Sequence, residues 1–206
     1  MPGSKAGLGR NAFQVADIKK RFLCHPRPRK TIMKEYEKFV AAAEKGDGDT
    51  LLRLIREHKE LHDYPGVDGC LTEVLHRECP QFLAAAFAAG LHPDSGPPGP
   101  PITLLQQAAC NSDVELIRLA IRHGADIERR NEDGETVLGY AASWGSLETV
   151  RTLVEAGANV NAVEGKEEGR YSTAVDATHS SNPEYDRAEI RAYLLQHGAR
   201  RYRELP

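Results

Sequence analysis

The sequence predicts an all-α solenoid of about five helix-turn-helix units joined by β-turn fingers, and three observations support this class. First, the 206-residue chain is 40% hydrophobic but only 6% aromatic, and alanine is frequent, which suits close-packed helices better than a sheet sandwich. Second, the chain repeats itself with a fixed period. Third, each repeat holds two short amphipathic segments that cannot bury their apolar faces alone, so neighbouring units must stack.

The period is 33 residues and is clearest between residues 98 and 163. Thr136, Leu138 and Ala141 each match the residue 33 positions earlier, and so does the pair Gly157-Ala158. A step of 99 residues, three periods, places Gly145 on Gly46. One register therefore runs through most of the chain.

The unit at 131–163 shows the role of each part of the repeat. Its opening turn ends in Gly134, which is free to take a positive φ. Thr136 follows where a hydroxyl caps the start of a short first helix. Gly157 supplies a left-handed stop at the end of the second helix. The second helix carries one apolar stripe, formed by Leu147, Val150, Leu153 and Val154.

This pattern resembles the ankyrin repeat, through the string GxTxLxxAA…GxxxxVxxLxxxGAxxN at 134–161. The resemblance covers about residues 34–200 and implies degenerate terminal units. His58 stands where the first unit's stop glycine is expected. A helix over 188–197, with Ile190, Tyr193 and Leu194 buried, should close the array. The five predicted units are about 34–64, 65–97, 98–130, 131–163 and 164–201, the last with insertions at 164–171 and 180–187.

The chain departs from the family pattern after each capping threonine, where the usual proline and histidine are absent. We expect the family's hydroxyl–imidazole brace to be weakened without loss of the fold. The positions concerned hold Leu104 and Gln106, Val137 and Gly139, and Ala174 and Asp176.

The resemblance also implies a function, because ankyrin repeats recognise proteins through the finger tips and the exposed part of each first helix on the concave side. The finger-tip positions are Arg130, Glu132, Asp133, Glu135, Glu164, Lys166, Glu167, Glu168, Arg170 and Tyr171. The helix positions are Cys110, Asn111, Ser143, Trp144, Ser180 and Ser181.

Two features of this predicted surface indicate its partner. Trp144 is the only tryptophan, and exposed aromatic residues often anchor interfaces. The alternative is that its ring folds over the neighbouring repeat as a packing lid. The finger tips carry six carboxylates and three basic groups, so we expect a protein partner with a basic surface. The alternative here is a solvated face that keeps the array soluble.

A cysteine and histidine group is the main candidate for other chemistry. Cys70, His76 and Cys79 lie close in sequence, and His58 and His62 are four residues apart. Zinc sites usually need a second matching ligand pair, and Cys70 and Cys79 fall at opposite ends of a predicted helix. We find no nucleophile signature or glycine-rich phosphate loop, and expect no catalysis, metal, cofactor or small-molecule substrate.

Charge divides the chain into a basic arm, residues 1–32, and an acidic ankyrin-repeat domain, residues 33–206. The arm holds eight of the 27 Lys and Arg residues and one acid, and we expect it to be disordered. It is a tether to nucleic acid or an anionic membrane, a passive tail, or a stretch upstream of a true start at Met33. Nucleic acid is not expected as a partner elsewhere on this acidic chain.

The predicted function is a non-catalytic protein–protein interaction scaffold, either a regulatory adaptor or an inhibitor or immunity-type protein that occludes a toxin or enzyme. A Cys/His metalloprotein is the alternative from another class. No run approaches the roughly 20 apolar residues that span a bilayer, and residues 1–20 lack a signal-peptide core. We therefore expect no membrane span and a cytoplasmic location.

Overall fold

The structure is a computed structural model that describes residues 30–64, 70–96, 100, 102–165, 171–179 and 187–206. The predicted basic arm lies outside these ranges except for its last three residues. Those three belong to the first described helix, which begins at Lys30, so the predicted domain boundary after residue 32 falls inside that helix. No helix in the described ranges is long and apolar enough to cross a membrane.

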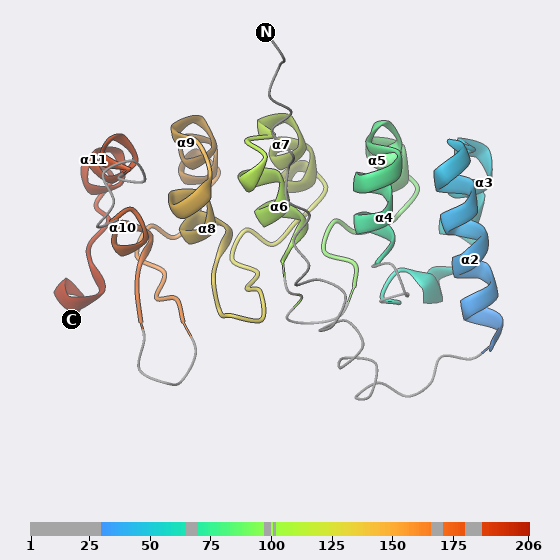
Figure 1. The fold of residues 1–206 in the computed structure, drawn as a ribbon, viewed down its shortest axis with the longest axis horizontal. Coiled ribbons are helices and arrows are strands. Elements are labelled where there is room, and N and C mark those ends of the chain that lie inside the picture. Colours follow the sequence, from blue (N-terminus) through green and yellow to red (C-terminus); the bar gives the residue numbers. More distant parts are fainter. Residues whose placement is uncertain (1–29, 65–69, 97–99, 101, 166–170, 180–186) are drawn as a thin grey trace, which may run out of the picture.

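The described residues form five helix pairs that stack in a row from one end of the molecule to the other (Figure 1). This confirms the predicted solenoid of five units. The pairs are α2 (Lys30–Lys45) with α3 (Gly48–Glu57), α4 (Leu71–Glu78) with α5 (Leu83–Ala88), α6 (Leu104–Cys110) with α7 (Val114–Arg122), α8 (Val137–Trp144) with α9 (Leu147–Glu155), and α10 (Ala174–Ala177) with α11 (Ala188–Gln196). Short 3-10 turns accompany them: η1 (Lys59–Leu61), η2 (Pro80–Phe82) and η4 (Tyr202–Glu204).

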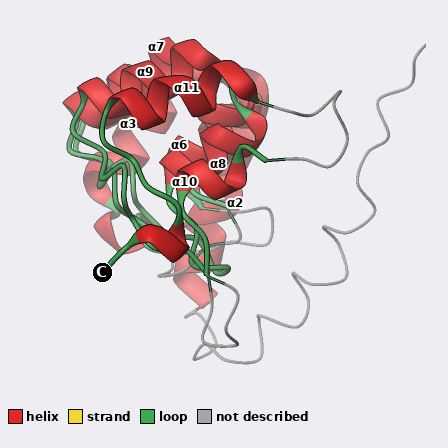
Figure 2. Ribbon diagram, turned by 90° about the vertical axis from the view of Figure 1, so that its left-hand side faces the viewer, coloured by secondary structure: helices red, strands yellow, loops and turns green. Residues whose placement is uncertain are grey.

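The helices lie in two layers, which Figure 2 shows from the end of the row. The second helices of the units, α3, α7, α9 and α11, form one layer, and the first helices α6, α8 and α10 form the other. The described parts of the connections between units lie on the side of the first helices, away from α7 and α9 (Figures 1 and 2). This places each finger next to the start of a first helix.

Local signals fix where the second helices begin and end. Asp47, Asp113 and Ser146 each accept a hydrogen bond from a backbone N–H of the first helical turn. Four of the second helices end at a glycine with positive φ, followed by an N–H bonded to the carbonyl five residues earlier. These glycines are Gly90, Gly124, Gly157 and Gly198. The first unit differs as predicted, because α3 ends at His58 with φ −121°.

Small side chains bring the first helices together. In α6 and α8, Ala108, Ala109, Ala141 and Ala142 are each fully buried. Gly145 has an ordinary φ of −85°, but a Cβ there would lie 2.8 Å from the Ala141 carbonyl oxygen of its own helix and 3.1 Å from the Ala109 carbonyl oxygen of the preceding unit. Glycine is therefore needed at this position for close approach rather than for an unusual backbone angle.

The last helix differs from its prediction in one residue. Ile190 and Leu194 are buried in α11 as expected, but Tyr193 is only half-buried. Its ring lies against His197, with centroids 4.0 Å apart, and under the Arg151 guanidinium of α9 at 5.2 Å. Tyr193 thus covers the edge between the last two units and does not enter their core.

Candidate functional site

The fourth finger, residues 130–135, is held between the fingers on either side of it. The Glu132 N–H donates to the Pro100 carbonyl at 2.8 Å, on the preceding finger. The Arg130 guanidinium donates to the Gly134 carbonyl at 2.6 Å and to the Val163 carbonyl at 2.8 Å, on the following finger. Arg130, predicted as a partner contact, therefore also connects two units.

Asn131, which sequence analysis did not single out, shapes this finger. Its side chain is buried and its Oδ1 accepts from the N–H groups of Asp133 (3.0 Å) and Glu135 (2.9 Å). Its amide nitrogen donates to Glu135 Oε2 at 2.9 Å. Asparagine at the start of an Asn-Glu-Asp-Gly turn is the sequence signal for this arrangement. The turn leaves Asp133 exposed and Glu132 and Glu135 half-buried.

Glu164 is not the exposed finger tip that was predicted. It is 4% exposed, and its Oε1 accepts hydrogen bonds from the Thr136 N–H at 3.0 Å and the Thr136 hydroxyl at 2.5 Å. The space it occupies exists because Gly139 has no side chain, since a Cβ there would lie 1.9 Å from Glu164 Oε2. Burial raises the pKa of this carboxyl above its ordinary value, although the bonds from Thr136 act in the opposite direction.

Other groups make contacts between units where the family's hydroxyl–imidazole brace is absent. Gln106 closes a capping box with Thr103 and donates its amide to the Glu135 carbonyl of the next unit at 2.9 Å. Asp176 accepts from the Tyr202 N–H at 2.8 Å. Glu164 makes the corresponding contact between the fourth and fifth units. The third, fourth and fifth units are therefore each hydrogen-bonded to the segment that follows them in the chain.

Trp144 lies at the end of α8 with 62% of its side chain exposed, the largest exposure among the described large hydrophobic residues. This exposure contradicts the alternative of a packing lid. Tyr140, one turn earlier in α8, lies on the same helix face because the two residues are four apart. Ser143 is half-buried, and Asn111 of the preceding unit is exposed.

The pKa of the Tyr140 hydroxyl is affected by burial, by Cys110 and by the finger acids. The hydroxyl shares a hydrogen bond with the Cys110 thiol of α6. Burial raises the pKa of the Tyr140 hydroxyl, and the negative charges of Glu135 and Asp133 raise it further. Burial likewise raises the pKa of Cys110, with Glu135 again adding to the effect. Asp133 and Glu135 of the fourth finger, with Tyr140 and Trp144 of the helix that follows it, are together called here the inner patch.

The remaining predicted contacts belong to the fifth unit. Tyr171 is 40% exposed and pairs with Tyr202, with ring centroids 5.4 Å apart. Tyr202 was missed by sequence analysis. Six predicted positions lie outside the described residues: Lys166, Glu167, Glu168, Arg170, Ser180 and Ser181.

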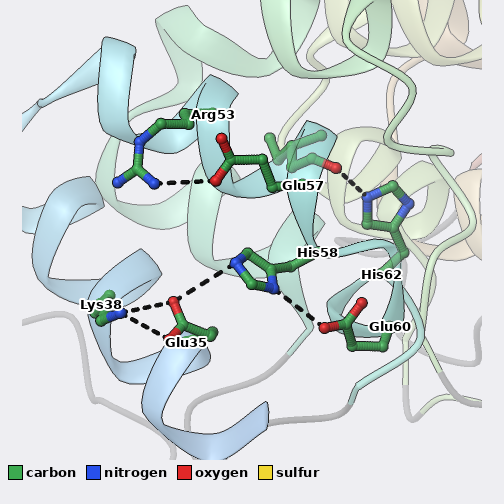
Figure 3. A network of polar contacts seen from close by, with 8 residues as sticks. Glu35, Lys38, Arg53, Glu57, His58, Glu60 and His62 are labelled. Carbon is green, nitrogen blue, oxygen red and sulfur yellow. Dashed lines mark hydrogen bonds and ion pairs between the residues drawn. The ribbon is translucent and has the colours of Figure 1, made fainter. Parts of the chain in front are cut away.

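The rings of His58 and His62, the two histidines of the first unit, contact different partners (Figure 3). The His62 ring lies against the Ile55 carbonyl, with Nε2 at 2.9 Å. The His58 ring lies between two carboxylates, with Nδ1 3.1 Å from Glu60 and Nε2 3.8 Å from Glu35. Hydrogen bonding to His58 helps to lower the pKa of Glu60, after a larger effect of a backbone N–H.

The predicted cysteine and histidine group is similarly dispersed. Cys70 precedes α4 and Cys79 follows it. Burial raises the pKa of the Cys79 thiol and lowers the pKa of His76. Among the residues whose positions are described, no three His, Cys, Asp or Glu side chains gather as they would around a metal ion.

Comparisons with known proteins agree with this architecture. The family model for ankyrin repeats, in three copies, matches residues 39–164. Mouse Rabankyrin-5 is 36% identical over 97 residues, which are 41% of this chain and 8% of that protein. Cortactin-binding protein 2 of Plecturocebus moloch is 35% identical over 99 residues, 48% of this chain and 6% of that protein. The chain thus spans less than a tenth of the length of either relative.

A solved structure extends the similarity over most of the chain. An ankyrin repeat domain from Acinetobacter baumannii AYE superposes with a TM-score of 0.62 at 27% identity. The match covers 79% of this chain and 82% of that domain.

Proposed function

Because the chain belongs to the ankyrin-repeat family, whose repeats generally mediate protein–protein interaction, we propose that it binds a partner protein through the inner patch and catalyses no reaction. The patch combines an exposed aromatic anchor on α8 with the acidic fourth finger. The contacts predicted from the sequence at Glu167, Glu168, Arg170 and Tyr171 remain part of the proposal.

The observation that carries this proposal is the exposure of Trp144 on a rigid support. The side chain is 62% exposed, yet α8 is capped by Thr136 and its Ala141 and Ala142 are fully buried between units. A large aromatic side chain held by a fixed backbone loses little conformational freedom on binding. Truncation of such anchors often costs 2 kcal/mol or more of binding energy.

The raised pKa values of two buried thiols support the proposal that the chain catalyses no reaction. A nucleophilic cysteine needs a lowered pKa, whereas burial raises the pKa of both Cys79 and Cys110.

The test is capture of partners from native lysate by the full chain, beside Trp144→Ala and a matched control, Leu195→Ala. Leu195 is 49% exposed on α11, in the other helix layer, so its truncation removes a comparable exposed side chain elsewhere. Circular dichroism first verifies that all three proteins are folded. We expect one set of partners to be retained by the parent and by Leu195→Ala and lost by Trp144→Ala.

The identity of those partners also separates an adaptor from an inhibitor. A stoichiometric complex with one enzyme or toxin, with loss of its activity, assigns the inhibitor. Several partners of micromolar affinity assign the adaptor. If Trp144→Ala captures what the parent captures, the proposed surface is wrong.

A further inference from the structure

We propose that the fifth unit binds an anionic oxygen group of the partner, a carboxylate or a phosphoryl group, at the guanidinium groups of Arg187, Arg191 and Arg201. All three residues are hydrogen-bonded to the short stretch that follows α10. The inference rests on the proposed function, because it gives the same partner a second contact in the unit that follows Trp144.

The first support is the way the three arginines share two residues, Thr178 and His179, which follow α10. The Arg187 N–H and the Arg191 guanidinium both donate to the Thr178 carbonyl, each at 3.3 Å. Arg201 Nη2 donates to His179 Nε2 at 2.6 Å. Arg191 Nη1 lies 3.5 Å from the other ring nitrogen, His179 Nδ1. The imidazole ring therefore lies between two guanidinium groups.

The second support is an unused donor edge on Arg187. Its Nη1 donates at 3.3 Å to the carbonyl of Gly145, the residue directly after Trp144. Its Nε is buried without a hydrogen-bond acceptor, and within the part of the chain that the structure describes Nη2 has none either. The Nε and Nη2 groups of a guanidinium form a fork that matches a carboxylate or phosphoryl group. An anion at this edge would give the buried donor the acceptor that it lacks.

The third support is the absence of ion pairs at two of these guanidinium groups. Among the described residues, neither Arg187 nor Arg201 lies within ion-pair distance of a carboxylate. Arg191 has a further interaction, so no free donor is assigned to it. Arginine side chains stay charged, and placing three of them together produces a positive potential that favours an anion.

Two acids of the same unit bind backbone groups. Asp176 accepts from the Tyr202 N–H at 2.8 Å, and Glu204 accepts from the Arg201 N–H at 3.2 Å. By sequence, residues 187–206 hold five arginines and two glutamates. This end of the acidic domain is therefore locally basic.

The proposed contact gives the binding surface two signs of charge. The acids of the fourth finger precede the start of α8, whereas the Arg187 guanidinium binds the Gly145 carbonyl at the end of α8. A partner that matches both charges is favoured in one orientation, because the reversed orientation places like charges together.

The test uses the full chain with 15N-labelled arginine, since the Nε–H signals in an NMR spectrum report on each guanidinium group separately. The probe is an octapeptide with blocked termini whose only charged residue is a central glutamate. Matched peptides carry phosphoserine or glutamine at that position. The protein variants are Arg187→Gln, Arg201→Gln and a control, Arg118→Gln. Arg118 lies on α7 and pairs with Glu115 at 3.2 Å, so the control removes the same charge from another unit.

We expect saturable shifts of the Arg187 and Arg201 signals with the glutamate or the phosphoserine peptide, with a dissociation constant on the order of 1 mM. Arg187→Gln and Arg201→Gln should each weaken binding at least about 5-fold, and Arg118→Gln less than about 2-fold. Glu184→Gln combined with Asp186→Asn removes the two acids that precede Arg187 in the sequence, and this variant should bind as tightly as the parent or more tightly. Tighter binding of the glutamate peptide assigns a carboxylate, and tighter binding of the phosphoserine peptide assigns a phosphoryl group.

The inference would be overturned by equal shifts with the glutamine peptide, or by no saturable shift with either anionic peptide up to about 10 mM. Equal weakening by Arg118→Gln and Arg201→Gln would also overturn it. These failures differ from failure of the proposed function. A partner that is captured by the parent chain, but not by Trp144→Ala, supports the binding surface whatever the peptides do.

Discussion

Glu164 and Thr136 join the fourth and fifth units through one carboxylate oxygen, which accepts from both the N–H and the hydroxyl of Thr136. The two residues are 28 positions apart, and both are buried. Thr136 also caps α8, because its hydroxyl accepts from the Gly139 N–H. The helix that carries Trp144 is therefore fixed at its start by a side chain from the next unit.

Replacing Glu164 by alanine should destabilise the fold by about 2 kcal/mol, because it leaves two buried donors of Thr136 without an acceptor. Urea unfolding monitored by circular dichroism measures the loss. Glu128→Ala is the control, since Glu128 accepts a single N–H, from Asn159, at the surface. It should cost less than about 1 kcal/mol. Equal losses of unfolding free energy in the two variants would show that the buried Glu164–Thr136 contact stabilises the fold no more than a surface hydrogen bond does.

The same carboxyl should make stability depend on pH. Burial raises the pKa of folded Glu164 above 4.5, so the folded chain keeps a proton that the unfolded chain has lost. The folded state then binds more protons, and stability falls as pH rises from 4.5 through the raised pKa. Glu164→Gln does not titrate. Its free energy of unfolding relative to the parent should be constant below pH 4.5 and should rise above it.

Urea unfolding of both proteins at a series of pH values measures this difference. A difference that stays flat across the window, or that falls with rising pH, would contradict the role assigned to burial.

Gly139→Ala should be destabilising although alanine favours helices by about 1 kcal/mol over glycine. The new Cβ would lie 1.9 Å from Glu164 Oε2 and would displace the carboxylate from Thr136. We expect a net loss of about 1 kcal/mol in the parent and a gain of similar size in Glu164→Ala. A double-mutant cycle of unfolding free energies measures the coupling. Additive effects would mean that Gly139 does not make room for Glu164.

His58→Gly should not stabilise the chain, even though the other described units end their second helices with glycine. His58 has φ −121°, so it bears no left-handed strain that glycine would relieve, and its ring lies against Glu60 and Glu35. By contrast, Gly157→Ala should cost about 1–2 kcal/mol, because Gly157 has φ +96°. Thermal unfolding compares the two variants. An increase in Tm for His58→Gly would contradict this interpretation.

The parts of the fold that depend on short-range chemistry were predictable from the sequence. Thr136 caps α8, Gly157 ends α9 with a positive φ, and the absence of a stop glycine at His58 changes the end of α3. Each of these signals lies within the element that it controls, so the period of 33 residues is enough to locate it.

The candidate site was predictable only in part, because its support comes from other units. Trp144 was found from its position in the repeat, but the role of Tyr140 was missed although the spacing of four residues was visible. Glu164 was placed on the surface because nothing local indicates that Gly139 opens a space for it. A missing side chain in one unit and a carboxylate in the next are connected only by the stacking of the units.

The central claim is that Trp144 lies in the partner interface. Since it is the only tryptophan, 5-fluorotryptophan incorporated into this chain gives a single 19F resonance even when the partner contains tryptophan. The measurement is the shift of that resonance, and its broadening by a soluble paramagnetic agent, as the captured partner is added to saturation. We predict a new resonance that is protected from the agent in the complex. An unshifted resonance that stays as accessible in a saturated complex as in the free chain would contradict the claim.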